Sequence, residues 1–229
     1  MSNVPEAADD NTRHSRALDA ELISDPDKLA AREALNGLRQ FDAVVEVVEH
    51  HLQPERPFRL RPSTILHLHR FALEGISAYA GVFRPAGIEI GGSKHQPVGA
   101  YIVPERIEEL CDYVNENWQT KLPLHLAAYV LWRLNWIHPF TDGNGRTARA
   151  TSYLVLCLRL GYLLPGSRTI PDQISDDKKP YYKALEHADQ AWNEGHLDVS
   201  RVQELLKTML ARQLYDVYTE AAGSAEHSY

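Results

Sequence analysis

The twelve residues from His138 to Arg149 contain side chains and glycines whose types suit phosphate chemistry. Gly143, Asn144 and Gly145 follow one another in this run. Because glycine and asparagine accept left-handed backbone angles, these residues can gather their N–H groups into a concavity that binds an anion. A helix that begins at Arg146 would add its dipole and its own N–H groups. The segment therefore predicts a phosphate-binding nest.

Two arginines at the start of this helix, Arg146 and Arg149, are three positions apart and so lie on one face of its first turn. Positive side chains at a helix N-terminus oppose the helix dipole. This arrangement is unfavourable unless a bound anion offsets it, and guanidinium groups grip phosphate oxygens well. The pair therefore indicates a polyphosphate ligand.

An acid and a base accompany the nest. Asp142 offers a carboxylate, and Mg²⁺ is often held by one or two carboxylates together with substrate phosphates. His138 lies four residues earlier, and an imidazole titrates near neutrality, so it suits a general base that takes a proton from an attacking hydroxyl. Base, metal ligand, nest and arginines within one short segment predict phosphate transfer.

Other phosphate and metal motifs do not fit this loop. The Walker pattern needs a lysine after its glycines, and none is present. The run from Asp142 to Gly145 resembles the start of a calcium loop, but Arg146 and Tyr153 occupy the fifth and twelfth positions, where ligands are needed. The sequence has no His-Glu-x-x-His zinc motif. A plain turn between helices would explain any one of these residues, but not all of them together.

Helices must position the loop, because apolar residues recur with a spacing of three to four along most of the chain. Asp25-Pro26 is a favourable helix start. The helix that follows is predicted to bury one stripe of side chains: Leu38, Phe41, Val45, Val48 and Leu52. Residues 124–137 are apolar on most faces and predict a buried central helix that leads into the loop. We interpret His67 and His69, two apart on another predicted helix, as packing or surface histidines.

One segment departs from the helical pattern. Residues 87–90 alternate as a short strand would, and Gly91-Gly92-Ser93 follows them, which predicts a small β-hairpin. The remainder of the sequence predicts helices, and we expect the polar N- and C-terminal ends to be poorly ordered. The prediction is an all-α fold with one small hairpin.

The bulk composition narrows the classes of partner. The 229 residues carry a formal net charge of −7, which disfavours binding to nucleic acid through bulk electrostatics. No apolar run approaches the ~18 residues of a membrane span, and the N-terminus lacks the pattern of a signal peptide. Cys111 and Cys157 lie within apolar helical patterns and are expected to be buried free thiols. We therefore expect a cytoplasmic protein that binds neither membrane nor nucleic acid.

The run from His138 to Arg149 resembles the signature of Fic (filamentation induced by cAMP) proteins, His-x-Phe-x-Asp/Glu-Gly-Asn-Gly-Arg-x-x-Arg, and matches every fixed position. Softer similarity covers roughly residues 60 to 195, including the stretches Tyr79 to Arg84 and Tyr181 to Leu185. The resemblance implies a Fic-type helical bundle with a β-hairpin flap. The chain would then comprise a flexible N-terminus (1–16), an N-terminal helical segment (17–58), a Fic domain (59–198) and a C-terminal helix with a flexible tail (199–229).

The resemblance also implies an activity: transfer of AMP from ATP to a Ser, Thr or Tyr hydroxyl of a target protein, which makes the chain a nucleotidyltransferase. By this similarity, His138 would deprotonate the target hydroxyl, Asp142 would hold Mg²⁺, and Phe140 would anchor the loop in the core. The residues implied to bind ATP are Gly143, Asn144, Gly145, Arg146, Arg149, Tyr181 and Tyr182. The flap would pair with an extended target segment by strand addition through Ile88, Glu89, Ile90 and Gly91.

Many proteins of this family are inhibited by a helix with the motif Ser/Thr-x-x-x-Glu-Gly/Asn, whose glutamate pairs with the second loop arginine. The matching helix here is degenerate, since Ala31 replaces Ser/Thr and Leu35 replaces Glu, while Asn36 fits. Glu33 is two residues from Leu35 and is expected to face elsewhere. Self-inhibition is therefore expected to be weak or absent, or to come from a separate antitoxin protein or from self-association.

Two alternative functions stay open. Related Fic proteins transfer UMP, phosphocholine or the γ-phosphate of ATP, and the loop alone does not separate these activities. A non-catalytic nucleotide sensor is the second alternative, although pure binding has no need of the base at His138.

Overall fold

The computed structural model describes residues 21–86 and 95–226, and within these ranges the chain is helical. It forms eight α-helices and no strand there, apart from an isolated antiparallel bridge between Glu21 and Ser77, which confirms the all-α prediction. The elements are α1 (Pro26–His51), α2 (Pro62–Leu73), the 3-10 turn η1 (Ala100–Ile102), α3 (Val103–Glu116), α4 (Pro123–Ile137), α5 (Asn144–Leu160), α6 (Ile170–Asp176), α7 (Lys178–Asn193) and α8 (Ser200–Glu226).

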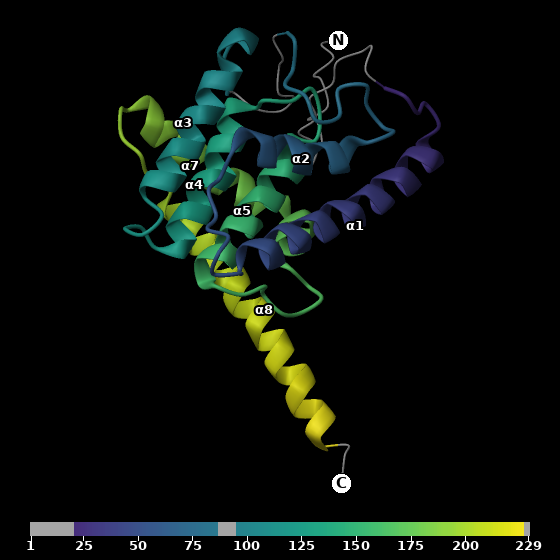
Figure 1. The fold of residues 1–229 in the computed structure, drawn as a ribbon, viewed down its shortest axis with the longest axis vertical. Helices are drawn as coiled ribbons and strands as arrows, with labels where there is room; N and C mark the ends of the chain where they lie inside the picture. The colour runs from purple at the N-terminus through teal and green to yellow at the C-terminus, as the bar shows by residue number, and fades with distance from the viewer. Residues whose placement is uncertain (1–20, 87–94, 227–229) are drawn as a thin grey trace, which may run out of the picture.

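The centre of the fold is the packed pair α4 and α5, which flank the loop. α4 is apolar all round and buried along most of its length, as expected of the central helix. Small side chains such as Ala127 and Ala148 let α5 approach closely, and Ser152 Oγ donates a hydrogen bond of 2.8 Å to the Ala127 carbonyl. In Figure 1 α1 and α2 lie next to each other on one side of this pair, and both of them contact α5. The loop between α4 and α5 is thus held from several sides.

The rotation of α1 differs from the prediction. Asp25 caps the helix as expected, because its Oδ1 accepts from the N–H groups of Asp27 and Lys28. However, Leu38 is 67% exposed and Phe41 is 37% exposed, so the predicted apolar stripe does not mark the buried face. The side chains that α1 buries are instead Asn36, Gln40, Ala43, Val44 and Val48.

Two buried amides explain this rotation. Asn36 Nδ2 donates to the carbonyls of Ala72 (3.3 Å) and Glu74 (2.9 Å), and Gln40 Nε2 donates to the Leu68 carbonyl at 2.9 Å. A buried polar group is costly unless it is hydrogen-bonded, and here α2 supplies the acceptors. Polar contacts therefore decide which face of α1 turns inward.

The predicted hairpin falls mostly outside the described residues. Ile88, Glu89, Ile90 and Gly91 all lie in the range 87–94, which the structure does not describe. The described residues on either side, 84–86 and 95–99, form no strand. The pairing of this segment with a target stays a prediction.

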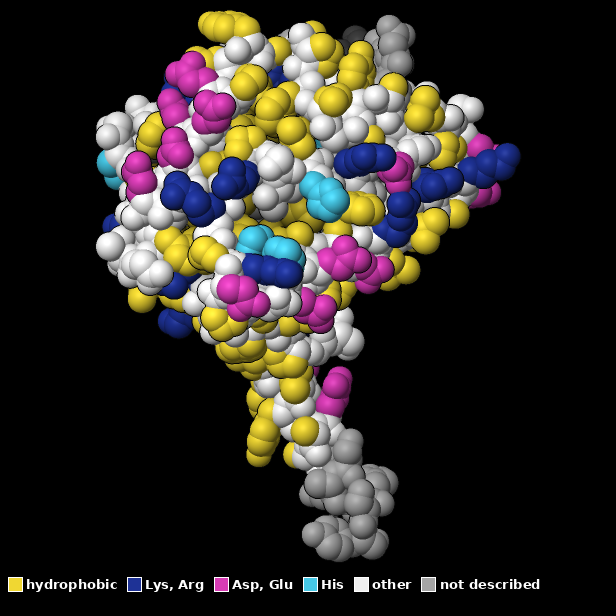
Figure 2. Space-filling view, viewed as in Figure 1, with side chains coloured by type: hydrophobic (Ala, Val, Ile, Leu, Met, Phe, Trp, Pro, Cys, Tyr) yellow, Lys and Arg dark blue, Asp and Glu magenta, His cyan; other side chains and the backbone are white. Residues whose placement is uncertain are grey.

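The last helix, α8, extends away from the body of the molecule (Figure 1). Leu214, Tyr215 and Tyr218 are exposed on it, and Figure 2 shows hydrophobic side chains along this projection. None of the described helices, α8 included, combines the length and the apolar character needed to cross a bilayer.

Both cysteines are buried and free, as the sequence predicted. Burial raises the pKa of Cys111 to about 12 and that of Cys157 to about 11. Since the thiolate is the reactive form, both side chains serve packing rather than chemistry.

Candidate active site

His138 occupies an unusual backbone conformation directly after α4. Its N–H closes the helix on the Leu134 carbonyl at 3.0 Å, and its angles are φ 53° and ψ 60°. It is the only non-glycine residue of the described chain with a positive φ. Such a conformation costs ~1–3 kcal/mol and persists only where surrounding contacts impose it. The strain is stored at the residue that the sequence assigns as the base.

The imidazole of His138 is buried and neutral. Its Nδ1 lies 3.3 Å from the Asn135 carbonyl, so Nδ1 carries the proton of the neutral ring and Nε2 is the basic nitrogen. Burial lowers the pKa of His138 to about 4. At neutral pH the side chain is therefore already in the form that a general base requires.

Phe140 and Asn144 fix the shape of the loop. Phe140 is fully buried, and its ring stacks on His69 with a centroid separation of 3.6 Å and an interplanar angle of 5°. The Asn144 side chain accepts from the Phe140 N–H at 2.9 Å and donates to the Phe140 carbonyl at 2.8 Å. The Asn144 side chain thus serves as a cross-link across the loop, while its backbone forms part of the predicted nest.

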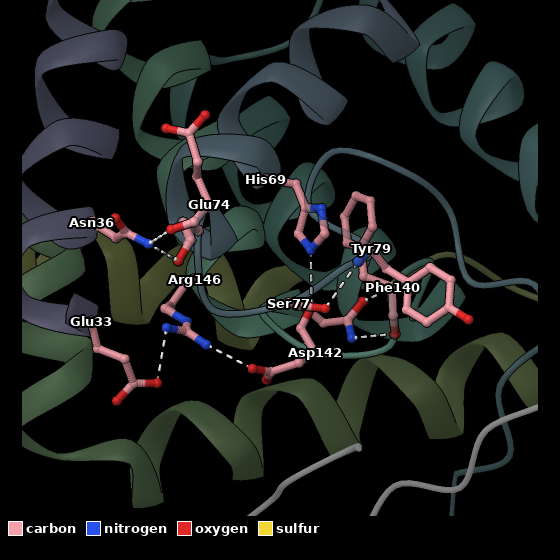
Figure 3. Close-up of polar contacts among 11 residues, drawn as sticks. Glu33, Asn36, His69, Glu74, Ser77, Tyr79, Phe140, Asp142 and Arg146 are labelled. Atoms are coloured by element: carbon pink, nitrogen blue, oxygen red, sulfur yellow. Dashed lines mark hydrogen bonds and ion pairs between the residues drawn. The ribbon is translucent and has the colours of Figure 1, made fainter. Parts of the chain in front are cut away.

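His69 joins the loop to the segment before residues 87–94. Its Nδ1 accepts from the Gly81 N–H at 3.0 Å, so its Nε2 carries the proton and donates to the Asp142 carbonyl at 3.0 Å (Figure 3). Burial lowers its pKa to about 4. The packing interpretation was right about its location, but the sequence did not reveal that His69 supports the residue predicted to bind metal.

The predicted nest coincides with the start of α5, which begins at Asn144 rather than at Arg146. Gly143 has φ 74°, and a Cβ there would meet Leu73 Cδ2 at 2.3 Å, so only glycine fits. A Cβ on Gly145 would lie 3.2 Å from Arg149 NH1. No side chain of the described chain caps α5, so the positive end of its dipole faces the loop. This geometry suits a bound anion.

Arg146 is paired with carboxylates in this structure. Its Nη2 lies 2.9 Å from Asp142 Oδ2 and its Nη1 lies 3.1 Å from Glu33 Oε1, so the guanidinium bridges two acids (Figure 3). The expectation that Glu33 faces away from the loop is therefore wrong. Glu33 is i−3 to the buried Asn36, and the inward rotation of Asn36 carries Glu33 toward α5.

The residues of the degenerate inhibitory motif do not reach the loop arginines. Ala31 and Leu35 are exposed and line a separate hollow with Ile23, and Asn36 is committed to α2. Arg149 forms no ion pair with any residue in the described ranges. The acid that this helix presents to the loop is Glu33, and it contacts the first arginine rather than the second.

A small cavity of about 70 Å³ brings most of the predicted site residues together. His138, Gly145, Arg149, Tyr181 and Tyr182 all line it, so the tyrosine pair of α7 faces the same space as the base. The sequence reasoning missed its other lining residues: His95, Asn135, Trp136, Leu185 and Asp189. Leu185 and Asp189 lie one and two turns beyond Tyr181 on α7, a helical spacing that would have identified them.

Arg149 also lines a second, larger hollow. This hollow measures about 670 Å³ and lies between α1 and the start of α5, with Leu38 and Phe41 on its wall. Ligand pockets usually measure ~300–1,000 Å³, so the 70 Å³ cavity is smaller than a typical ligand site. Arg149 is the side chain that lines both spaces.

Asp142 is the carboxylate of the loop that the sequence assigns to a metal. Among the described residues no group of three or more His, Cys, Asp or Glu side chains could hold a metal ion. Asp142 is 38% exposed beside the nest, and Mg²⁺ commonly takes one or two carboxylates and completes its shell with phosphates and water. The donor set therefore fits Mg²⁺ that arrives with a polyphosphate.

The two buried histidines predict a loss of stability in acid. Their folded-state pKa values of about 4 lie below the ordinary 6.5, so the unfolded chain binds more protons between these values. Their contribution is complete above pH 6.5 and is lost as the pH falls toward 4. At about pH 5 each should lower the free energy of unfolding by ~2 kcal/mol relative to about pH 7.5.

Urea unfolding at both pH values tests this prediction. His69→Gln should weaken the pH dependence, whereas His67→Gln, at an exposed position on the same helix, should leave it unchanged. Equal pH dependence in all three proteins would contradict the assignment.

Three comparisons with known proteins bear on this site. Residues 59–156 match the Fic/DOC family model. The protein adenylyltransferase Fic of Drosophila willistoni is 34% identical over 135 residues, which cover 58% of this chain and 24% of that protein. The chain thus spans about a quarter of the length of this curated relative.

Solved structures share the fold. A segment of Fic-1 from C. elegans is 25% identical with a TM-score of 0.62, covering 86% of this chain and 55% of that one. The N-terminal Fic domain of a cell filamentation protein from Bartonella quintana, solved with bound ADP, has a TM-score of 0.57 at 20% identity and covers 85% and 91% of the two chains.

Proposed function

Residues 59–156 form a Fic/DOC family domain, and from that premise we propose that the protein transfers AMP from ATP to a Ser, Thr or Tyr hydroxyl of a target protein. The observation that carries the proposal is the neutral, buried imidazole of His138, which lines one cavity with Arg149 and lies beside the open nest of α5. A base next to an anion site is needed for group transfer and not for binding alone. The adenylyltransferase name of the Drosophila relative supports AMP as the group.

The proposed step conserves atoms and charge. His138 Nε2 accepts the proton of the target hydroxyl while the hydroxyl oxygen forms a bond to the α-phosphorus. The bond from that phosphorus to the oxygen bridging to the β-phosphorus breaks, and pyrophosphate leaves with the electron pair. The nest at Gly143 to Gly145 and the guanidinium of Arg149 hold the phosphates in line.

Arg146 must exchange its partners during binding. In the structure it contacts Asp142 and Glu33, whereas phosphate oxygens offer it a stronger charge. Once Arg146 turns to phosphate, Asp142 would hold Mg²⁺, which neutralises negative charge on the phosphates when bound. Tyr181 and Tyr182 would then pack against the base of the nucleotide.

Labelled ATP tests the proposal directly. Purified protein and a cell lysate are incubated with Mg²⁺ and ATP labelled at the α- or the γ-phosphate, and the proteins are separated and counted. Label from the α-position alone supports AMP transfer. Label from the γ-position means phosphorylation, and label from neither position, with ATP still bound, favours a nucleotide sensor. UTP labelled at the α-phosphate tests UMP transfer in the same assay.

The ion pair between Glu33 and Arg146 predicts that the Glu33 carboxylate competes with phosphate for Arg146. Glu33→Gln removes a charge that occupies Arg146, so ATP affinity should rise by up to about fivefold, since a part-exposed ion pair is worth ~0–1 kcal/mol. Calorimetry with a non-hydrolysable ATP analogue measures this. Glu46→Gln, at an exposed position further along α1, is the matched control. Unchanged or weaker binding by Glu33→Gln would show that the ion pair does not oppose the nucleotide.

A further inference from the structure

Arg84 is a buried arginine whose donors all point at backbone carbonyls. Its N–H donates to the Pro139 carbonyl at 2.9 Å and its Nε donates to the His138 carbonyl at 2.8 Å. Its NH1 donates to the Ala86 carbonyl at 2.9 Å, and its NH2 donates to the Val98 carbonyl. Arg84 thus hydrogen-bonds to the carbonyls of two consecutive loop residues and to the chain on both sides of residues 87–94.

The burial of this side chain is costly and therefore informative. Arg84 is only 2% exposed, and burial lowers the pKa of its guanidinium. A buried charge is expensive unless it is paired or fully hydrogen-bonded. In the described chain no carboxylate forms an ion pair with Arg84, so the three carbonyls that accept from its guanidinium supply the compensation.

Arg84 Nε donates to the carbonyl of His138, the residue with the strained backbone. His138 has φ 53° and ψ 60°, a region that a histidine leaves unless other contacts impose it. The angle ψ of His138 sets the direction of its carbonyl, and φ sets the position of its side chain relative to α4. A residue that fixes the His138 and Pro139 carbonyls together therefore fixes the direction in which the imidazole enters the cavity.

We propose that Arg84 is a positioning residue that holds His138 in its left-handed conformation and couples it to the chain segments flanking residues 87–94. This inference rests on the proposed function only where it concerns the rate of transfer. Arg84 does not line the cavity, so it acts through His138 and not on the nucleotide. Without it, His138 relaxes toward an ordinary conformation and its Nε2 moves away from the target hydroxyl.

Arg84→Met keeps an unbranched side chain and removes all three side-chain hydrogen bonds. The rate of transfer at saturating ATP should fall about 100-fold, the size expected when a catalytic group moves by ~1 Å. The affinity for a non-hydrolysable ATP analogue should stay within about twofold, because the nest and Arg149 are untouched. A purely structural role would weaken both quantities together.

Arg159→Met is the matched control, since Arg159 also donates to a backbone carbonyl, that of Lys121, but lies at the far end of α5. It should leave the transfer rate unchanged. If Arg84→Met does not fold, Arg84→Lys replaces it. A lysine reaches only one of the three carbonyls, so transfer should fall at least tenfold with nucleotide affinity kept.

A crystal structure of the Arg84 variant separates this inference from the proposed function. A negative φ at His138 supports the positioning role, and an unchanged φ of about 53° overturns it, whatever the protein transfers. If the wild-type protein transfers no label, the proposed function fails and the φ of His138 still decides the role of Arg84. A transfer rate in Arg84→Met equal to that of Arg159→Met also overturns the inference.

Discussion

Changing His138 to alanine is expected to lower AMP transfer by about 100- to 10,000-fold, the contribution of a well-placed general base. The reason is local: burial lowers the pKa of the imidazole and keeps it neutral, and the side chain that is proposed to accept the proton lines the cavity. ATP affinity should change little, because the nest and the arginines that are proposed to bind phosphate remain. Transfer from α-labelled ATP and calorimetry with an unreactive analogue measure the two effects.

The backbone of His138 makes a second variant necessary. Alanine is strained at φ 53°, so His138→Ala could disturb the loop as well as remove the base. Asparagine tolerates this region, and its amide can still donate to the Asn135 carbonyl, but it is not a base. His138→Asn should therefore lose transfer as fully as His138→Ala while keeping the thermal stability of the wild type. Transfer that survives in both variants would exclude His138 as the base.

Changing Phe140 to alanine is expected to lower the free energy of unfolding by about 3–5 kcal/mol. The ring is fully buried, stacks on His69 at 3.6 Å and approaches Phe83 at 5.9 Å, so its removal leaves a cavity between the loop and α2. A domain of ordinary stability has ~5–15 kcal/mol in total, so the loss is a large share. Urea unfolding followed by circular dichroism measures it.

The same change should also affect the site. His69 lies between Phe140 and the Asp142 carbonyl, so loss of the stack loosens the support of the predicted metal ligand. Phe41→Ala is the control, because this phenylalanine is 37% exposed on α1 and should cost much less stability. Losses of similar size in the two variants would contradict the anchoring role of Phe140.

The local features of the site could be predicted from the sequence because short-range geometry determines them. Asp25 caps α1, residues 124–137 form the central helix, and Gly143 adopts a positive φ at the start of α5. Each of these outcomes depends on the conformational limits of one residue and on the backbone a few residues away. For the same reason the twelve-residue loop could be interpreted without the rest of the molecule.

The rotation of α1 could not be predicted in this way. The apolar stripe through Leu38 and Phe41 indicated one buried face, but Asn36 and Gln40 found carbonyl acceptors on α2 and turned a different face inward. Glu33 then came to lie against Arg146. A pattern of apolar residues carries no information about where another helix places its carbonyl acceptors. The buried face of α1 predicted from that pattern was therefore wrong.

The sequence by itself determined that a histidine, a carboxylate, glycines and arginines share the loop from His138 to Arg149, and the chemistry proposed for the loop follows from these residues. Only the tertiary structure decided which distant residues support the backbone of this loop and which carboxylate pairs with its first arginine. Arg84 grips the His138 carbonyl, His69 supports Asp142, and Glu33 occupies Arg146. These three residues precede their partners in the loop by 54, 73 and 113 positions, and contacts over such separations depend on how whole helices pack rather than on local propensity.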